Sequence, residues 1–161
     1  MTIKRIDQSE SDLVTELFNE YRMFYGQSPD LSLAEKFINT RLENNESVIF
    51  VALEQHGQEI KPVGFTQLYP VYSSVRACKN WILNDLFVKK EYRGKGARYQ
   101  LIKNAMDFAQ TNGATYMQLE TATDNYNAQK LYESIGFQKK PADNSFFVYT
   151  ISLSEQAVTA K

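Results

Sequence analysis

Apolar and polar residues follow one another along this chain with two different periods, and each change of period marks the boundary of an expected element. Where apolar residues return every three or four positions we expect a helix, and where they alternate or form a short continuous run we expect a strand. The strand pattern covers residues 2–7, 47–53, 61–72, 80–88, 113–121 and 145–153. The helical pattern covers residues 9–26, 32–42, 97–108 and 127–135.

Local signals refine this picture at the ends of the helices. Ser9 and Ser32 each stand three positions before an acidic residue, which is the spacing of a capping box, so we expect each to cap a helix. Gly136 follows the last helical pattern and precedes Phe137, an arrangement typical of a helix C-terminus. The run SVIFVAL at residues 47–53 is almost continuously apolar, so we expect a strand that is buried on both faces.

The elements follow in the order strand, two helices, hairpin, strand, helix, strand, helix, strand. This order predicts a single α/β or α+β domain with a mixed sheet. A length of 161 residues suits one domain with its own core. We expect the domain to span residues 1–153 and a polar tail to span residues 154–161.

Composition excludes several classes of protein. No apolar run approaches the length of a transmembrane helix, and the opening MTIKRIDQSE lacks the apolar core of a signal peptide, so we expect a cytoplasmic protein without membrane contacts. The single cysteine, Cys78, excludes an internal disulfide and a cysteine-built metal site. The single histidine, His56, stands in an expected turn, so we expect neither a metal nor histidine-based nucleophilic catalysis.

Positive charge is concentrated in one short segment. Lys89 to Arg98 holds five Lys or Arg residues and one Glu, whereas the remainder holds 13 basic and 18 acidic residues, a net charge of −5. A general nucleic-acid binder spreads basic charge over a whole face. The local concentration therefore favours a small polyanion over a nucleic acid as the ligand.

The same segment forms a glycine-rich turn between an expected strand and an expected helix. The first N–H groups of a helix have no partner within it, and glycine lets the backbone approach a ligand closely, so such a turn is a phosphate cradle. Arg93, Lys95 and Arg98 would strengthen it. The alternative is a plain strand-to-helix turn on a solvated basic surface. The nucleotide P-loop and the dinucleotide fingerprint are both absent from the sequence.

The run LNDLFVKKEYRGKGARYQLI resembles the acetyl-CoA-binding segment of the GNAT superfamily of N-acetyltransferases, in which a strand, the pattern R/Q-x-x-G-x-G/A and a helix follow one another. Downstream, TDNYNAQKLYESIGF resembles the next segment of that superfamily. The resemblance implies a mostly antiparallel, twisted sheet flanked by helices. NDLFV is similar to the branch that acetylates small amines and polyamines. Arg98 departs from the family, which usually has Gly or Ala there.

The resemblance also implies a binding mode for acetyl-CoA, the acetyl donor. The backbone of Leu86, Phe87 and Val88 would bond the pantetheine arm as an added strand would. Asn125 would meet the pantetheine or acetyl region, although its residue type also suits a helix N-cap. The pyrophosphate would be held by Arg93, Gly94, Lys95, Gly96, Ala97 and Arg98.

The family mechanism is direct transfer in a ternary complex, and Tyr132 would be the acid that protonates the departing sulfur. From its helical spacing alone, Tyr132 would be a core tyrosine. Asn84 stands where the polyamine branch has an acidic residue, so the general base is not evident. Asp85 is a candidate base or, as the preferred alternative, a buried and hydrogen-bonded aspartate. Glu120 has the same two interpretations.

Aromatic and acidic residues near the two N-terminal helices suit a cationic amine. The expected substrate-binding residues are Tyr25, Asp30, Tyr69, Asn84 and Glu120. These expectations describe an N-acetyltransferase that acts on a small primary amine. The resemblance suggests that the enzyme is a homodimer. An alternative is a non-catalytic acyl-CoA sensor on the same fold, motivated by Arg98 and the missing base.

Overall fold

The computed structural model describes residues 1–141, 145 and 147–151. The chain divides into two compact units, one spanning Met1–Tyr126 and the other beginning at Asn127. The first unit contains the sheet and three of the described helices.

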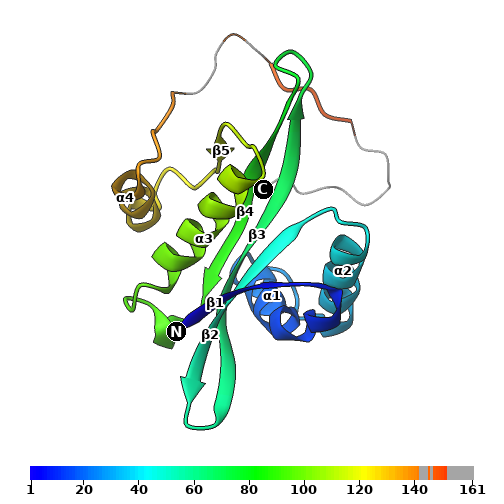
Figure 1. Cartoon of the computed structure of the whole chain (residues 1–161), viewed down its shortest axis with the longest axis vertical. Coiled ribbons are helices and arrows are strands. Elements are labelled where there is room, and N and C mark those ends of the chain that lie inside the picture. Colours follow the sequence, from blue (N-terminus) through cyan, green and yellow to red (C-terminus); the bar gives the residue numbers. More distant parts are fainter. Residues whose placement is uncertain (142–144, 146, 152–161) are drawn as a thin grey trace. The chain divides into compact units, whose positions relative to one another are not determined.

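The sheet of the first unit has five strands in the order β1-β2-β3-β4-β5 (Figure 1). The first three pairings are antiparallel, and β5 lies parallel to β4. This architecture confirms the predicted mixed, mostly antiparallel α/β fold. The strands are β1 Thr2–Ile6, β2 Val48–His56, β3 Glu59–Ser73, β4 Cys78–Val88 and β5 Met117–Gln118. The helices are α1 Asp12–Phe24, α2 Leu31–Glu43, α3 Ala97–Thr111 and α4 Tyr126–Ile135, and short 3-10 turns are η1 Gln8–Glu10 and η2 Lys90–Tyr92. None of the described helices is long and apolar enough to cross a membrane.

The sheet is covered on both faces, with α1 and α2 on one side and α3 on the other (Figure 1). Ile49 and Val51 of β2 belong to the apolar cluster that α1 and α2 complete. Phe50, between them in sequence, meets Phe108 of α3 with ring centroids 5.9 Å apart. Because successive strand residues point to opposite faces, a continuously apolar run is needed where both faces are buried. The prediction made from SVIFVAL is therefore confirmed.

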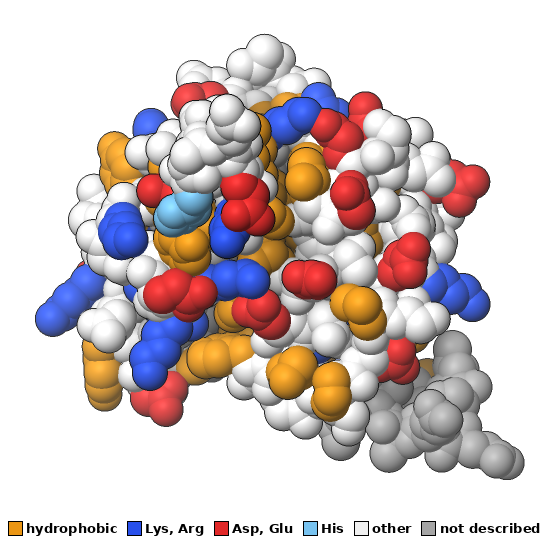
Figure 2. All heavy atoms as spheres, turned by 90° about the horizontal axis from the view of Figure 1, so that it is seen from below, with side chains coloured by type: hydrophobic (Ala, Val, Ile, Leu, Met, Phe, Trp, Pro, Cys, Tyr) orange, Lys and Arg blue, Asp and Glu red, His pale blue; other side chains and the backbone are white. Residues whose placement is uncertain are grey.

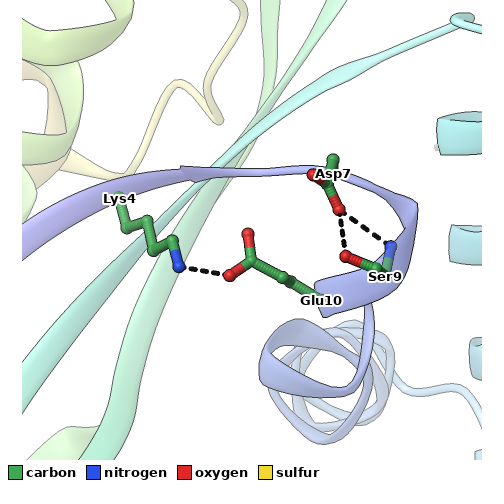
Figure 3. Close-up of polar contacts among 4 residues, drawn as sticks. All are labelled: Lys4, Asp7, Ser9 and Glu10. Carbon is green, nitrogen blue, oxygen red and sulfur yellow. Dashed lines mark hydrogen bonds and ion pairs between the residues drawn. The ribbon is translucent and has the colours of Figure 1, made fainter.

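The two predicted serine caps are wrong: α1 begins after Ser11, which makes no side-chain capping bond, and aspartates cap η1 and α2. The Asp7 carboxylate accepts from the Ser9 backbone N–H at 2.9 Å and from the Ser9 hydroxyl at 2.6 Å, so it caps η1, while Lys4 pairs with Glu10 beside it (Figure 3). Asp30 caps α2 by accepting from the N–H of Leu33 at 2.9 Å. The negative charge of a carboxylate at a helix N-terminus also interacts favourably with the helix dipole, whereas an uncharged hydroxyl lacks this interaction.

The strand predicted over residues 113–121 is reduced to β5, and a buried side chain explains the loss of strand structure just before it. The Oδ1 atom of Asn80 accepts from the N–H groups of Thr115 and Tyr116 at 2.8 and 3.0 Å, and from the Thr115 hydroxyl at 3.1 Å. These backbone donors are therefore not used in a strand ladder. In the strand predicted over residues 145–153, residues 147–151 are not in a strand, and residues 146, 152 and 153 lie outside the described chain.

Replacing Asn80 with leucine should lower the free energy of unfolding by about 1–3 kcal/mol, because it removes the acceptor on which three donors converge. Asn104→Leu is the matched control, because the side chain of Asn104 makes an exposed hydrogen bond to the carbonyl of Gln100 in its own helix. Urea unfolding of the two variants checks the prediction. A loss no larger for Asn80→Leu than for the control would contradict it.

Candidate functional site

The glycine-rich turn has the backbone geometry of an anion cradle. Gly94 and Gly96 have φ angles of +77° and +82°, which glycine adopts without strain. Gly96 is the N-cap of α3 and makes no side-chain capping bond, so no cap side chain of its own satisfies the first N–H groups of that helix. A Cβ added to either glycine would meet no atom within 4 Å among the described residues. The residues present therefore fit a phosphate group approaching the backbone.

The basic side chains around this turn have partners that sequence analysis did not predict. The Nζ atom of Lys89 lies 3.0 Å from the carboxylate of Glu20 on α1, so the charge of Lys89 is already paired. Arg93 donates from Nε to the carbonyl of Val88 at 2.9 Å, which places its guanidinium at the end of β4. Ala97 is buried and Arg98 is half-buried in the first turn of α3. On the face drawn in Figure 2, basic and acidic side chains are interspersed.

Tyr92 of η2 joins the cradle to the tip of the β2–β3 hairpin. Its hydroxyl lies 3.2 Å from Nε2 of His56, and the Nζ atom of Lys95 lies 5.1 Å from the centre of its ring. His56 is thus exposed at the end of β2, as expected for a surface residue, but it contacts a residue 36 positions away. This contact braces η2 immediately before the two glycines.

The end of β4 carries the three residues expected beside a pantetheine arm. Leu86, Phe87 and Val88 pair with β3 on one edge. On the other edge, β5 pairs only with Trp81 and Ile82, so residues 83–88 have no strand partner there within the described chain. An extended ligand could bond this edge as an added strand.

β3 and β4 approach each other closely at the same end of the sheet. A Cβ added to Gly64 of β3 would lie 2.7 Å from the carbonyl oxygen of Phe87 and 2.8 Å from a methyl group of Val88. Only glycine leaves room for this approach.

A β-bulge lies in the middle of β4, where Asn84 and Asp85 follow one another. Asp85 pairs with Gln67 and Leu83 pairs with Leu68, so Asn84 is an extra residue on β4. Asn84 is exposed, whereas Asp85 is only 2% exposed and accepts from the Asn84 amide at 3.0 Å. Asp85 is thus buried and hydrogen-bonded, as the preferred alternative expected, and its role as a base stays a prediction.

Asp85 is the centre of a buried polar cluster, which we define as Tyr21, Gln67, Tyr69 and Asp85. The Nε2 group of Gln67 donates to Asp85 at 2.8 Å and to the hydroxyl of Tyr69 at 2.7 Å. Burial, together with the charge of Asp85 and a hydrogen bond with it, raises the pKa of Tyr21. Burial and the charge of Asp85 likewise raise the pKa of Tyr69. Both phenols therefore stay protonated at neutral pH.

The remaining residues that were predicted to bind the amine substrate differ in their surroundings. Tyr25 is 54% exposed, and its ring centre lies 5.0 Å from that of Tyr21. Asp30 already uses its carboxylate to cap α2. Glu120 is exposed two residues after β5. The structure thus links Tyr69 to Asp85 through Gln67, and it places Tyr25 against Tyr21. Sequence analysis missed Gln67, whose one signal was a polar residue inside an apolar strand.

Tyr132 belongs to the second unit, where it lies half-buried on α4. Its carbonyl accepts from the N–H of Gly136 at 3.2 Å and from that of Phe137 at 3.0 Å, and its ring centre lies 6.0 Å from that of Phe137. Gly136 has a φ angle of +113°, so the predicted glycine stop is confirmed. Asn125 stands directly before α4. The chemical roles of Tyr132 and Asn125 stay predictions.

The raised pKa values of Tyr21 and Tyr69 predict a loss of stability in alkali. Above about pH 10 the unfolded chain releases both phenolic protons, whereas the folded chain retains them. The folded state then binds more protons, so the free energy of unfolding should fall as the pH rises through this range. Urea unfolding of the unaltered chain at increasing pH measures this fall.

A double variant, Tyr21→Phe with Tyr69→Phe, should flatten the alkaline decline. The matched control is Tyr72→Phe with Tyr99→Phe, because these two tyrosines are 69% and 49% exposed. An equal decline in both double variants would contradict the assignment.

Comparison with known proteins identifies a family whose model covers the glycine cradle. Residues 12–137 match the model of the Acetyltransferase (GNAT) family. The chain is 44% identical to YhfO, an uncharacterised N-acetyltransferase of Bacillus subtilis, over 95% of this chain and 98% of that protein. It is 34% identical to thialysine N-epsilon-acetyltransferase of Bos taurus over 47% of this chain and 44% of that protein. A crystal structure of a probable acetyltransferase superposes with a TM-score of 0.83 at 38% identity, covering 97% of this chain and all of that one. This protein therefore belongs to the GNAT family of acetyltransferases.

Proposed function

We propose that this protein transfers the acetyl group of acetyl-CoA to a primary amine of a small molecule, by direct transfer in a ternary complex. One observation carries the proposal: within the described residues, positions 83–88 of β4 have no strand partner on one edge, this segment leads towards the glycine cradle, and it contains the buried carboxylate of Asp85. The donor side and the acceptor side of the site would then both be built on one strand. The resemblance of the sequence further suggests a cytoplasmic homodimer of the small-amine branch.

Different residues of the chain would hold different parts of acetyl-CoA. The N–H groups at the start of α3, with Gly94 and Gly96, would hold the pyrophosphate, and the free edge of β4 would hold the pantetheine arm. When bound, acetyl-CoA supplies a reactive acetyl thioester. Tyr132 would give the departing sulfur its proton, since a phenol with an ordinary pKa of about 10 is protonated at neutral pH.

The acceptor side supports a cationic amine. Asp85 supplies buried negative charge that acts on Tyr21, and the ring of Tyr21 meets that of the exposed Tyr25. Aromatic faces attract ammonium groups. The bovine relative is named for transfer to the N-epsilon atom of thialysine, an amine nitrogen, which supports an amine acceptor here.

The test is acetyl-CoA-dependent thiol release with a mixed panel of polyamines, free amino acids, aminoglycosides and short peptides. Release above the background without amine is expected, and testing the pool in parts then identifies the substrate class. Calorimetry with acetyl-CoA runs in parallel. Binding without release from any amine would favour the acyl-CoA sensor, and absence of binding would overturn both functions.

A further inference from the structure

The tip of the β2–β3 hairpin reaches the segment before the glycine cradle through a pair of aromatic rings. His56 is the last residue of β2 and is exposed (pale blue in Figure 2). Its Nε2 atom lies 3.2 Å from the hydroxyl of Tyr92, and the two rings meet edge to face with their centroids 6.1 Å apart. Tyr92 ends η2, two positions before Gly94. The only histidine of the chain is thus held beside the segment that is expected to bind phosphate.

Tyr92 also contacts the cradle itself. The Nζ atom of Lys95, the residue between the two glycines, lies 5.1 Å from the centre of the Tyr92 ring. A cation is attracted to the face of an aromatic ring. His56 and Lys95 are exposed and Tyr92 is half-buried, so a ligand can reach this group. We call these three residues, His56, Tyr92 and Lys95, the tip cluster.

The protonation state of His56 determines what the Tyr92 hydroxyl can do. A neutral imidazole with a bare Nε2 atom accepts the single phenolic proton, which is then already used. A protonated imidazole has no acceptor, because both of its nitrogens donate. Its Nε2 group must then donate to the Tyr92 oxygen, and the phenolic proton becomes free for another acceptor. Protonation of His56 therefore adds a positive charge and releases a hydrogen-bond donor at the same place.

The charges on the elements that meet at the tip cluster are balanced while His56 is neutral. Besides Lys95, they are Glu54 of β2, Glu59 and Lys61 of β3, and Lys90 and Glu91 of η2. Glu59, which is paired in register with His56, already has its carboxylate 3.2 Å from Nζ of Lys61. A protonated His56 makes this sum positive and repels Lys95. An anion bound at the tip cluster would relieve that repulsion and favour the protonated state.

We propose that the tip cluster is a second phosphate-binding element of the acetyl-CoA site, and that it holds a phosphate of the nucleotide end more tightly when His56 is protonated. The inference rests on the proposed function, from which it takes its ligand. The cradle offers backbone N–H groups at the start of α3, whereas the tip cluster offers a charge and a hydroxyl that depend on pH. The pyrophosphate and the 3′-phosphate of coenzyme A share the chemistry that this cluster recognises.

The experiment measures the Kd of coenzyme A by calorimetry from pH 5.5 to 8, for the unaltered chain and for His56→Gln. Glutamine can still form a hydrogen bond with Tyr92 but cannot become charged. The Kd of the variant should exceed that of the unaltered chain about 3- to 10-fold at pH 5.5 and less than about twofold at pH 8. The phosphate itself titrates near pH 6, but equally for both chains, so this effect cancels in the ratio.

The same pair of chains with 3′-dephospho-coenzyme A identifies which phosphate is bound. If the ratio of Kd values at pH 5.5 falls to about one with this ligand, the tip cluster holds the 3′-phosphate. If the ratio is unchanged, the cluster holds the pyrophosphate. Either result supports the inference.

Two further measurements separate the proposed role from a structural one. Tyr92→Phe keeps the ring beneath Lys95 and removes the hydroxyl, so its loss of affinity should be larger at pH 5.5 than at pH 8. Tyr72→Phe, at an exposed tyrosine of β3, should bind like the unaltered chain at both pH values. Because the chain has one histidine, its imidazole signal in an NMR titration belongs to His56, and the midpoint should move to higher pH when coenzyme A is bound.

The inference and the proposed function fail in different ways. A ratio of Kd values that is equal at every pH, or a midpoint that coenzyme A does not move, would overturn the tip cluster as a binding element while the transferase stands. Absence of coenzyme A binding to the unaltered chain at every pH would overturn the proposed function and the inference together.

Discussion

Replacing Tyr132 with phenylalanine is expected to lower kcat at least about 100-fold, while the Kd for acetyl-CoA stays within about twofold. The substitution removes the phenolic proton assigned to the departing sulfur, and without it the leaving group must depart as a thiolate. The ring contact with Phe137 survives, because phenylalanine keeps the ring. Thiol release measures kcat, and calorimetry measures Kd.

Tyr126→Phe is the matched control for this prediction. Tyr126 lies on the same helix and is 67% exposed, so its hydroxyl has no assigned part in the chemistry. The control should keep its kcat. If Tyr132→Phe also keeps its kcat, Tyr132 is a packing residue and the acid must be sought elsewhere.

Replacing Gly96 with valine should weaken acetyl-CoA binding at least about tenfold, or about 1.4 kcal/mol. The side chain would project into the open space beside the first N–H groups of α3, where the phosphates are expected. The φ angle of +82° adds backbone strain on the order of 1–3 kcal/mol, because a β-branched residue adopts this conformation poorly.

Gly113→Val separates strain from binding. Gly113 follows α3 at its other end, has a φ angle of +77°, and also has no described atom within 4 Å of an added Cβ. The two variants should therefore lose similar stability in urea unfolding. Only Gly96→Val should lose affinity in calorimetry, and equal affinities would mean that the ligand does not approach the glycine cradle.

The parts of the fold that depend on local patterns could be predicted from the sequence. SVIFVAL indicated a doubly buried strand because no polar position interrupts it, and the two glycines of the cradle indicated positive φ between a strand and a helix. Both signals act over a few residues and need no knowledge of distant partners. The helix stop at Gly136 is of the same kind.

The parts that depend on distant partners could not be predicted. The pairing of Lys89 with Glu20 joins residues 69 positions apart, and it offsets one of the five positive charges of the basic segment Lys89 to Arg98. Asn80 reaches across 35 positions to shorten a strand. The predictions of the capping residues were wrong for a different reason. Several side chains that can accept a hydrogen bond lie near each helix start, and the three-dimensional path of the chain determines that Asp7 and not Ser9 is the acceptor.

The same limit applies to the candidate site. The family pattern identified β4 and the cradle, since their residues are contiguous in sequence. The Asp85 cluster draws on α1, β3 and β4, so its composition depends on how these elements pack. Gln67, which donates to both Asp85 and Tyr69 in that cluster, resembled any polar residue in a strand.

The bulge at Asn84 places one residue of β4 outside the pairing with β3. Leu83 faces Leu68 and Asp85 faces Gln67 on consecutive positions of β3, so the ladder would close without the intervening residue. Asn84 adds length to β4 without adding to the core. Apolar packing places no demand on the identity of this residue, and its side chain instead donates a hydrogen bond of 3.0 Å to the Asp85 carboxylate. A change of residue here would therefore act on that buried carboxylate and leave the apolar core as it is.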